Sequence, residues 1–218
     1  MWQKIIKFLV GILAIPVMVA VTRAFYVNII AVTELSGILK YFMWGVGSYI
    51  ALHLLFYKPT FFYVLGHEAV HAITSWVMGG KIQSFKVTEE GGSVSTTKTN
   101  AVIELSPYFI PIYAIILMAV YFVVAYSYKI NGAAFIFAIG FTLTLHIVMT
   151  IEVMKMRQPD MVKSGYFFSI VAVYVLNIVI IAMLFSLLFP SFSSKKFFMD
   201  SFTFSKEIYG AIVRQLFF

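Results

Sequence analysis

Two histidines and a glutamate stand close together within a long apolar segment of the chain. Residues 66–71 read Gly-His-Glu-Ala-Val-His, so that His67 and His71 are four positions apart. On a helix such positions share one face, and two imidazoles on that face can hold the same metal ion. Glu68 then lies beside the water molecule that the metal would activate. The spacing therefore predicts a zinc site with Glu68 as its base.

Ordinary core packing is the alternative interpretation, because a lone buried histidine is more often a satisfied core residue than a ligand. Here that alternative must place all three ionisable side chains in one apolar run, roughly Thr60 to Met78. Each such group in hydrocarbon costs several kcal/mol unless it is paired or functional. We therefore favour the metal site.

The composition places this motif in a membrane protein. Of 218 residues, 61% are hydrophobic and 11% are charged, and the mean hydropathy is +0.95, which excludes an ordinary soluble domain. The net charge of +7 comes from Lys and Arg residues that cluster in short loops, so we expect anionic lipid headgroups rather than nucleic acid as partners. Cysteine is absent, so any zinc must be held by His, Asp or Glu.

The rest of the chain must supply helices that position the motif. Apolar runs predict an all-α polytopic protein with six transmembrane helices, at about residues 5–21, 41–57, 60–78, 101–126, 133–151 and 166–189. We interpret the first run as an uncleaved anchor rather than a signal peptide, because it is long and its cleavage signal is weak. Residues 23–40 are predicted to form a mixed loop, in which a short interfacial helix is an open alternative. We expect a single domain over residues 1–218, with its core at about 60–190.

Two further segments differ from the apolar runs. Residues 81–99 predict a β-hairpin after the third helix, with its turn at residues 89–92, Glu-Glu-Gly-Gly. The hairpin is either an ordinary loop or an edge strand that an extended substrate could join. Residues 191–218 predict an amphipathic interfacial helix. Pro107 and Pro111 interrupt the predicted fourth helix and free backbone carbonyls there.

A catalytic zinc site needs a third protein ligand and an open position for water. Val77 occupies the place, six residues after the motif, where one zinc-protease pattern has a histidine. Residues 89–90 are acidic but fall in the predicted turn. His146 and Asp160 remain as candidates, followed by His53, for which a hydrogen bond between helices is the main interpretation and a role near the metal the other.

The motif at residues 66–71, the Gly79-Gly80 pair that ends its helix and the Gly-rich hairpin that follows resemble the site-2 protease family of intramembrane zinc metalloproteases. The resemblance extends from Thr60 to about Ile180. In that family a distant aspartate on a later helix completes the zinc site, and Asp160, preceded by a proline, matches it by position. The resemblance thus implies Zn²⁺ held by His67, His71 and Asp160.

The match departs from the family pattern at several positions. Met161 follows the aspartate where the family has glycine, and the family's upstream asparagine is missing. Ser106-Pro107 is the nearest remnant of its Gly-Pro-x-x-Asn motif. These differences indicate a divergent branch.

The resemblance implies an intramembrane zinc endopeptidase that hydrolyses peptide bonds of membrane-anchored protein substrates, with Glu68 as the catalytic base. We expect an integral, multi-pass protein of a prokaryotic cell membrane. A second hypothesis is a non-proteolytic membrane protein that retains the zinc site, closed by both His146 and Asp160. A third, a transporter with His and Asp relays, would need half-helices or repeats, and the sequence has no evident ones.

Overall fold

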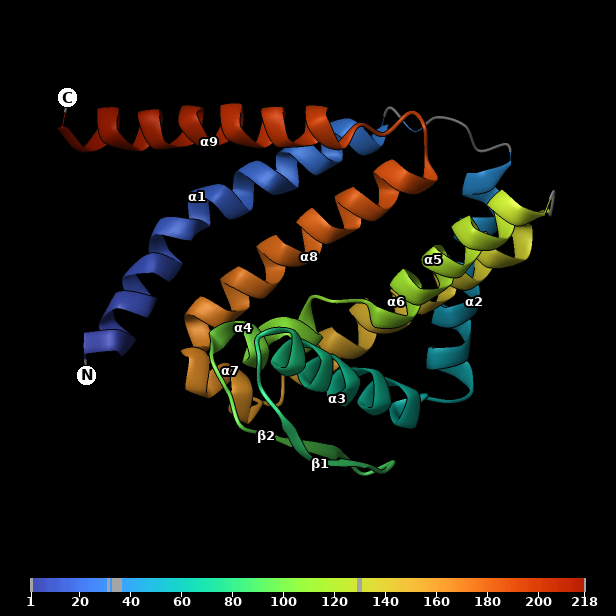
Figure 1. The fold of residues 1–218 in the computed structure, drawn as a ribbon. Helices are drawn as coiled ribbons and strands as arrows, with labels where there is room; N and C mark the ends of the chain where they lie inside the picture. The colour runs from blue at the N-terminus through green and yellow to red at the C-terminus, as the bar shows by residue number, and fades with distance from the viewer. Residues whose placement is uncertain (1, 31, 33–36, 129–130, 218) are drawn as a thin grey trace. The chain divides into compact units, whose positions relative to one another are not determined.

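The computed structural model describes residues 2–30, 32, 37–128 and 131–217 (Figure 1). The chain divides into two compact units, one made of residues 1–34 and 161–218 and the other of residues 35–160. Residues 66–71 and Asp160 all belong to the second unit, so the predicted metal ligands lie within one body.

The first unit contains three long helices, α1 (Trp2–Ile30), α8 (Tyr166–Leu188) and α9 (Ser194–Phe217). α1 packs against both of the others (Figure 1). The predicted C-terminal helix is confirmed as a helix by α9. Its place at a membrane interface stays a prediction.

α1 is longer than the sequence predicted, because the segment from Arg23 to Ile30 is helical and not part of a loop. Its polar residues find partners on α9. Arg23 Nη1 donates to Glu207 Oε2 at 3.3 Å, and Asn28 Nδ2 donates to Asp200 Oδ2 at 2.8 Å. The sequence pattern does not reveal these contacts, which tie the last two turns of α1 to α9. Residues 31 and 33–36 of the predicted loop lie outside the described residues.

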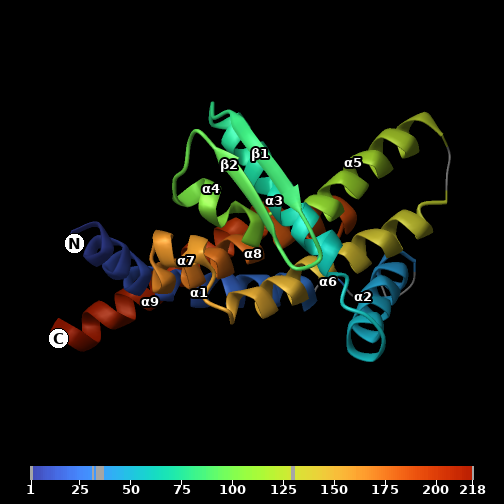
Figure 2. The ribbon, with the colours of Figure 1, turned by 90° about the horizontal axis from the view of Figure 1, so that it is seen from below.

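The second unit carries the motif helix and the predicted hairpin. Strands β1 and β2 are antiparallel, with Phe85 opposite Val94, and the hairpin lies along α3 in both views (Figures 1 and 2). The prediction of a hairpin after the motif is thus confirmed. The elements in order are α2 (Ile38–Leu55), α3 (Thr60–Val77), β1 (Ile82–Val87), β2 (Gly92–Thr96), α4 (Ala101–Leu105), the 3₁₀ helix η1 (Ser106–Tyr108), α5 (Ile112–Ser127) and α6 (Ala133–Met154), and α7 (Pro159–Ser164) begins at the unit's end.

Helices α2 and α6 approach each other so closely that only glycine fits at two positions. A Cβ atom at Gly45 would collide with the carbonyl oxygen of Phe137, and one at Gly140 would collide with that of Phe42. Small residues at such crossings let helix backbones pack tightly, as they do between helices in membranes. This contact fixes α6, the helix that leads to Asp160.

A hydrophobic core joins this helix pair to the motif helix. The core lies beside the face of α3 that carries Tyr63, so packing there sets the rotation of α3 about its own axis. Its buried members come from α2, α3 and α6, and they are Tyr49, Tyr63, Leu145 and Met149.

The predicted fourth transmembrane helix is broken in two. The segments before and after the break, 101–108 and 112–127, are bent by 73°. Pro107 lies within η1 and Pro111 is the N-cap residue of α5. Because proline lacks an N–H and restricts the residue before it, the helix cannot continue through this segment.

Four helices of the described chain, α1, α2, α6 and α8, are long and apolar enough to cross a membrane, or five if the broken pair counts as one span. This agrees with a membrane protein, but the predicted count of six is not confirmed. α3 has the necessary length, yet it is not among these helices. Its two histidines, its glutamate and its hydroxyl residues lower its mean hydropathy.

Candidate metal centre

Helix α3 brings the two histidines of the motif to one face, as the spacing predicted. The imidazole rings of His67 and His71 have centroids 4.9 Å apart and planes 77° apart. Glu68 is buried, with 8% of its surface exposed, on the same helix. The rings are therefore close enough to share one ion, and a carboxylate stands next to them.

Asp160 reaches this pair from the start of α7. Pro159 is the first residue of α7 and favours its first turn. Arg157, two residues earlier, has φ 50°, a left-handed conformation in the connection between α6 and α7. The result is that Asp160 Oδ2 lies 3.4 Å from His71 Nε2.

His67, His71 and Asp160 together could hold a metal ion. One ligand atom from each lies within 4.8 Å of the others, and the described residues contain no other group of this kind. Two ligands of a tetrahedral zinc ion, each bonded at about 2.0–2.1 Å, are about 3.3 Å apart. The 3.4 Å between His71 Nε2 and Asp160 Oδ2 matches that separation.

The second nitrogen of His71 is held by backbone. His71 Nδ1 donates to the carbonyl oxygen of Ile103 at 2.9 Å. In a continuing helix that carbonyl would accept from residue 107, but residue 107 is proline and has no N–H. Pro107 thus frees the carbonyl, as predicted for this segment. Metal-binding histidines typically donate their other N–H in this way, which presents the opposite nitrogen to the metal.

The short helix that carries Ile103 is itself fixed at its start. The Asn100 side chain accepts a hydrogen bond from the Ile103 N–H at 2.9 Å, so it caps α4. The Ser106 hydroxyl also donates to the Ile103 carbonyl, at 3.1 Å. Ile103 is therefore held at both its N–H and its C=O, and it offers His71 a fixed acceptor.

His67 lies in more enclosed surroundings. The ring of Tyr108, a fully buried residue of η1, meets the His67 ring edge-on with centroids 4.9 Å apart. The buried Nδ1 atom of His67 has no hydrogen-bond partner among the described residues. A buried polar atom without a partner costs about 1–3 kcal/mol. A metal ion on the ring's other nitrogen would be part of what compensates this cost, so these residues fit a metal.

Glu68 contacts the hairpin directly. A Cβ atom at Gly92, the first residue of β2, would lie 2.5 Å from Glu68 Cγ and 2.9 Å from its Oε1. Only glycine lets the strand pass this close to the carboxylate. The hairpin thus places its backbone against the predicted base.

A cleft of about 330 Å³ opens beside the motif. His67 and Glu68 line it, together with the turn and first strand residue of the hairpin, Glu90 to Gly92. Lys58 and Glu152, paired at 2.7 Å, line it as well. The candidate metal ligand and the candidate base therefore line the same cleft.

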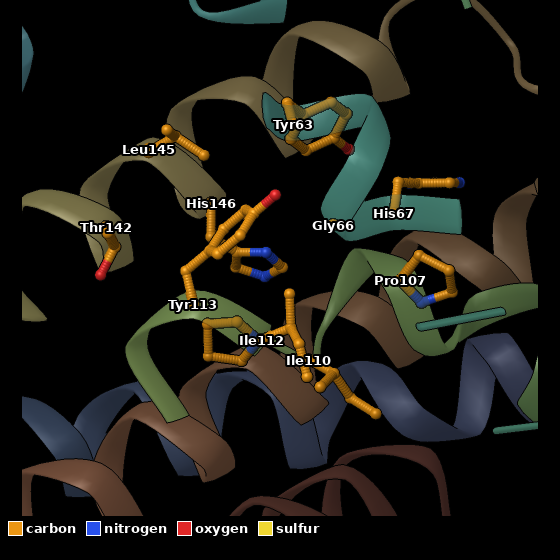
Figure 3. Close-up of a pocket in the computed structure, with 11 residues that line it drawn as sticks. Tyr63, Gly66, His67, Pro107, Ile110, Ile112, Tyr113, Thr142, Leu145 and His146 are labelled. Atoms are coloured by element: carbon orange, nitrogen blue, oxygen red, sulfur yellow. The ribbon is translucent and has the colours of Figure 1, made fainter. Parts of the chain in front are cut away.

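The other residues considered as metal ligands are not part of the group formed by His67, His71 and Asp160. His53 is bonded between helices, with Nδ1 3.2 Å from the Tyr49 hydroxyl and Nε2 3.2 Å from Glu152 Oε1, which matches the main interpretation. His146 is buried on α6 and is not in the metal-binding group. It lines a small cavity together with His67 (Figure 3). Residues 89–90 lie at the hairpin turn, as predicted.

Sequence reasoning missed three neighbours of the site, namely Tyr108, Gly92 and Tyr113. Tyr113 donates to the Phe62 carbonyl at 2.6 Å, and its ring lies against Gly66, where a Cβ would be 2.8 Å from it. A glycine immediately before the first motif histidine was the available signal for this close contact.

Comparisons with models of protein families, with curated proteins and with solved structures find no match for this chain.

Proposed function

We propose that this protein is an intramembrane zinc endopeptidase that hydrolyses peptide bonds of membrane-anchored substrates, a divergent relative of the site-2 protease family. One observation carries the proposal. His67, His71 and Asp160 gather within 4.8 Å, and the cleft beside them is lined by His67 and by Glu68. Candidate ligands, a candidate base and a cleft are thus combined in one unit of a chain with several apolar helices.

Zinc is the metal that the donor set favours. Two imidazoles and one carboxylate form a recurring ligand set of catalytic zinc, and it leaves a fourth position open. Thiolates are absent from the chain. When bound, Zn²⁺ polarises a carbonyl and lowers the pKa of a water molecule to about 7.

The chain's own residues supply the remaining chemistry. Glu68 accepts the proton of the attacking water and delivers it to the leaving amine. The Ile103 carbonyl holds His71 so that Nε2 lies toward Asp160, the residue with which it would hold the ion. Burial of Glu68 beneath β2 keeps its carboxylate close to the cleft and away from bulk solvent.

The hairpin supplies a place for an extended substrate. A helical peptide bond is shielded and already hydrogen-bonded, so a substrate helix has to unwind before it is cleaved. β2 lies against Glu68, and most residues of the two strands are exposed. An unwound segment that joins the sheet edge would run along the cleft.

The alternative of a closed, purely structural zinc site receives less support. It needs a fourth protein ligand, and the candidate group in the described chain has three members, without His146. A site with three protein ligands next to a cleft is the arrangement of catalytic zinc.

Purified chain in detergent micelles tests the proposal through Glu68→Gln. Fluorescein-labelled casein and a synthetic single-span peptide serve as unfolded and membrane-type probes. We expect cleavage of one or both by the wild type and a rate loss of about 10²–10⁴-fold in the variant, with zinc content unchanged. Equal rates in the two proteins would remove Glu68 as the base. Zinc binding without any cleavage would favour the non-proteolytic alternative.

A further inference from the structure

Helices α2 and α6 run in the same direction through their contact. In their first halves, Gly140 of α6 lies against the backbone of Phe42, and at their ends His53 Nε2 lies 3.2 Å from Glu152 Oε1. Both helices are long and apolar enough to cross a membrane. If they cross it side by side, their carboxyl ends reach the same membrane face, which we call the exit face. Their amino ends reach the opposite face, the entry face.

Helix α5 runs in the direction opposite to α6. Tyr121 of α5 contacts Phe135, near the start of α6, with ring centroids 5.7 Å apart. Tyr113, near the start of α5, lines a cavity with Leu145, which is further along α6. α5 belongs to the broken pair of helices that can count as one membrane span. It therefore leads from the exit face back to the entry face, where α6 begins.

The segment between these crossings contains the metal motif. It starts where α2 ends and stops where the broken pair begins, and both points lie at the exit face. A chain that leaves and regains one face crosses the membrane an even number of times or not at all. Within residues 56–100, which are all described, α3 is the one helix with the length for a crossing, and it is not among the helices apolar enough to span. One helix cannot make two crossings, so α3 stays at the exit face.

The β-hairpin leads to the same placement by a separate argument. A sheet of two strands leaves unpaired backbone groups along both outer edges, and lipid-exposed edges of this kind do not occur within the hydrocarbon of a bilayer. Most residues of the two strands are exposed. The hairpin lies along α3, and Gly92 lies against Glu68 (Figure 2). The predicted base is thus beside a segment that belongs in water or among lipid headgroups.

The third candidate ligand and the cleft lie at the exit face as well. Asp160 comes after α6 has ended at Met154, and its Oδ2 lies 3.4 Å from His71 Nε2. The cleft that His67 lines is bounded on the α6 side by residues 149, 152 and 153, which belong to the last turns of that helix. The metal centre is therefore level with the end of α6 and not with its middle.

We propose that the metal centre lies at one membrane surface, the exit face, and that it cleaves bonds in the segment that flanks a substrate's apolar span on that side. This inference rests on the proposed function and narrows its substrates to the juxtamembrane segments of membrane-anchored proteins. Such a segment is outside the hydrocarbon, so its backbone can be extended and can pair with a strand edge. Water reaches the centre directly from the membrane surface.

Labelling of single-cysteine variants tests the placement without any cleavage. The chain has no cysteine of its own, so each variant carries one thiol. Tyr57→Cys and Lys155→Cys, just after α2 and α6, mark the exit face. Lys40→Cys, at the start of α2, and Asn131→Cys, just before α6, mark the entry face. Ser93→Cys on β2 is the test position, and all five side chains are exposed. Bacterial cells that express each variant are treated with a membrane-impermeant maleimide before and after the membrane is disrupted.

We expect Ser93→Cys to react as Tyr57→Cys and Lys155→Cys do, and the two entry-face variants to show the opposite pattern. If Ser93→Cys instead follows the entry-face variants, α3 crosses the membrane and the proposal is overturned. The same pattern at all four marker positions would also overturn it, because α2 and α6 would then not cross. Ser84→Cys on β1, likewise exposed, decides the matter if Ser93→Cys does not fold.

The position of the cut tests the substrate class. Two synthetic peptides share one apolar span and differ in the polar flank at one end, which is long in one peptide and nearly absent in the other. Each is incorporated with the wild-type protein into lipid nanodiscs, and the products are identified by mass spectrometry. We expect cuts within the long flank and a loss of cleavage in the peptide without it. Cuts in the middle of the apolar span would overturn the substrate class. A wild type that cleaves neither peptide nor casein would instead refute the proposed function, and the labelling pattern would still decide where α3 lies.

Discussion

His71 Nδ1 donates to the carbonyl oxygen of Ile103 at 2.9 Å, and that carbonyl has no residue-107 amide to accept from because residue 107 is proline. The break after α4 thus leaves the Ile103 carbonyl as an acceptor that orients His71, a candidate metal ligand on α3. The proline has a chemical consequence at the site in addition to bending the chain.

Pro107→Ala tests this relationship. The new N–H at position 107 can bond to the Ile103 carbonyl and would compete with His71 for it. We expect zinc affinity to fall by about 10-fold, the lower end of the range for loss of an outer partner. Chelator competition measures it. Pro16→Ala, which also replaces a proline within a helix but lies in the other unit, is the control. Unchanged affinity in Pro107→Ala would show that the carbonyl does not orient His71.

Gly92→Ala tests the contact between the hairpin and the predicted base. The added methyl group would stand 2.5 Å from Glu68 Cγ, so either the carboxylate or the strand must move. Because Glu68 is not a metal ligand, we expect zinc content to stay at the wild-type level while the cleavage rate falls by about 10–100-fold. Ser93→Ala, the exposed next residue of β2, is the matched control. A wild-type rate in Gly92→Ala would mean that Glu68 tolerates displacement.

Gly140→Leu tests the packing that fixes α6. A side chain at this position runs into the backbone of Phe42, and overpacking of this kind typically costs about 1–3 kcal/mol or more. We expect a lower unfolding temperature in micelles, followed by circular dichroism at several scan rates. Gly47→Leu, on α2 with no atoms within 4 Å of an added Cβ, is the control. Similar unfolding temperatures for both variants would refute close packing between α2 and α6.

Short-range sequence patterns predicted much of this structure. The four-residue spacing of His67 and His71 gave a helical face, and the Gly91-Gly92 pair gave the hairpin turn. The idea that prolines free carbonyls in the fourth apolar segment is confirmed at Ile103. Each of these features depends on a few neighbouring residues, so a sequence contains the information directly.

Features that depend on tertiary contacts were harder to predict. In the sequence, Arg23 marks the start of a predicted loop. In the structure it lies within α1 and pairs with Glu207, which is far away along the chain. The six predicted spans included α3, whose polar motif lowers its hydropathy. The sequence leaves both His146 and Asp160 open as third ligands, and only the folded chain shows that Asp160 lies beside His71.

Zinc content of the purified chain tests the central claim most directly. Wild type, His67→Ala, Asp160→Ala and His53→Ala are prepared side by side, dialysed against the same low zinc concentration and analysed by mass spectrometry of the metal. The account predicts about one zinc ion per chain in the wild type and in His53→Ala, and a loss of at least about 10-fold in the two ligand variants. Equal zinc in all four proteins would contradict it.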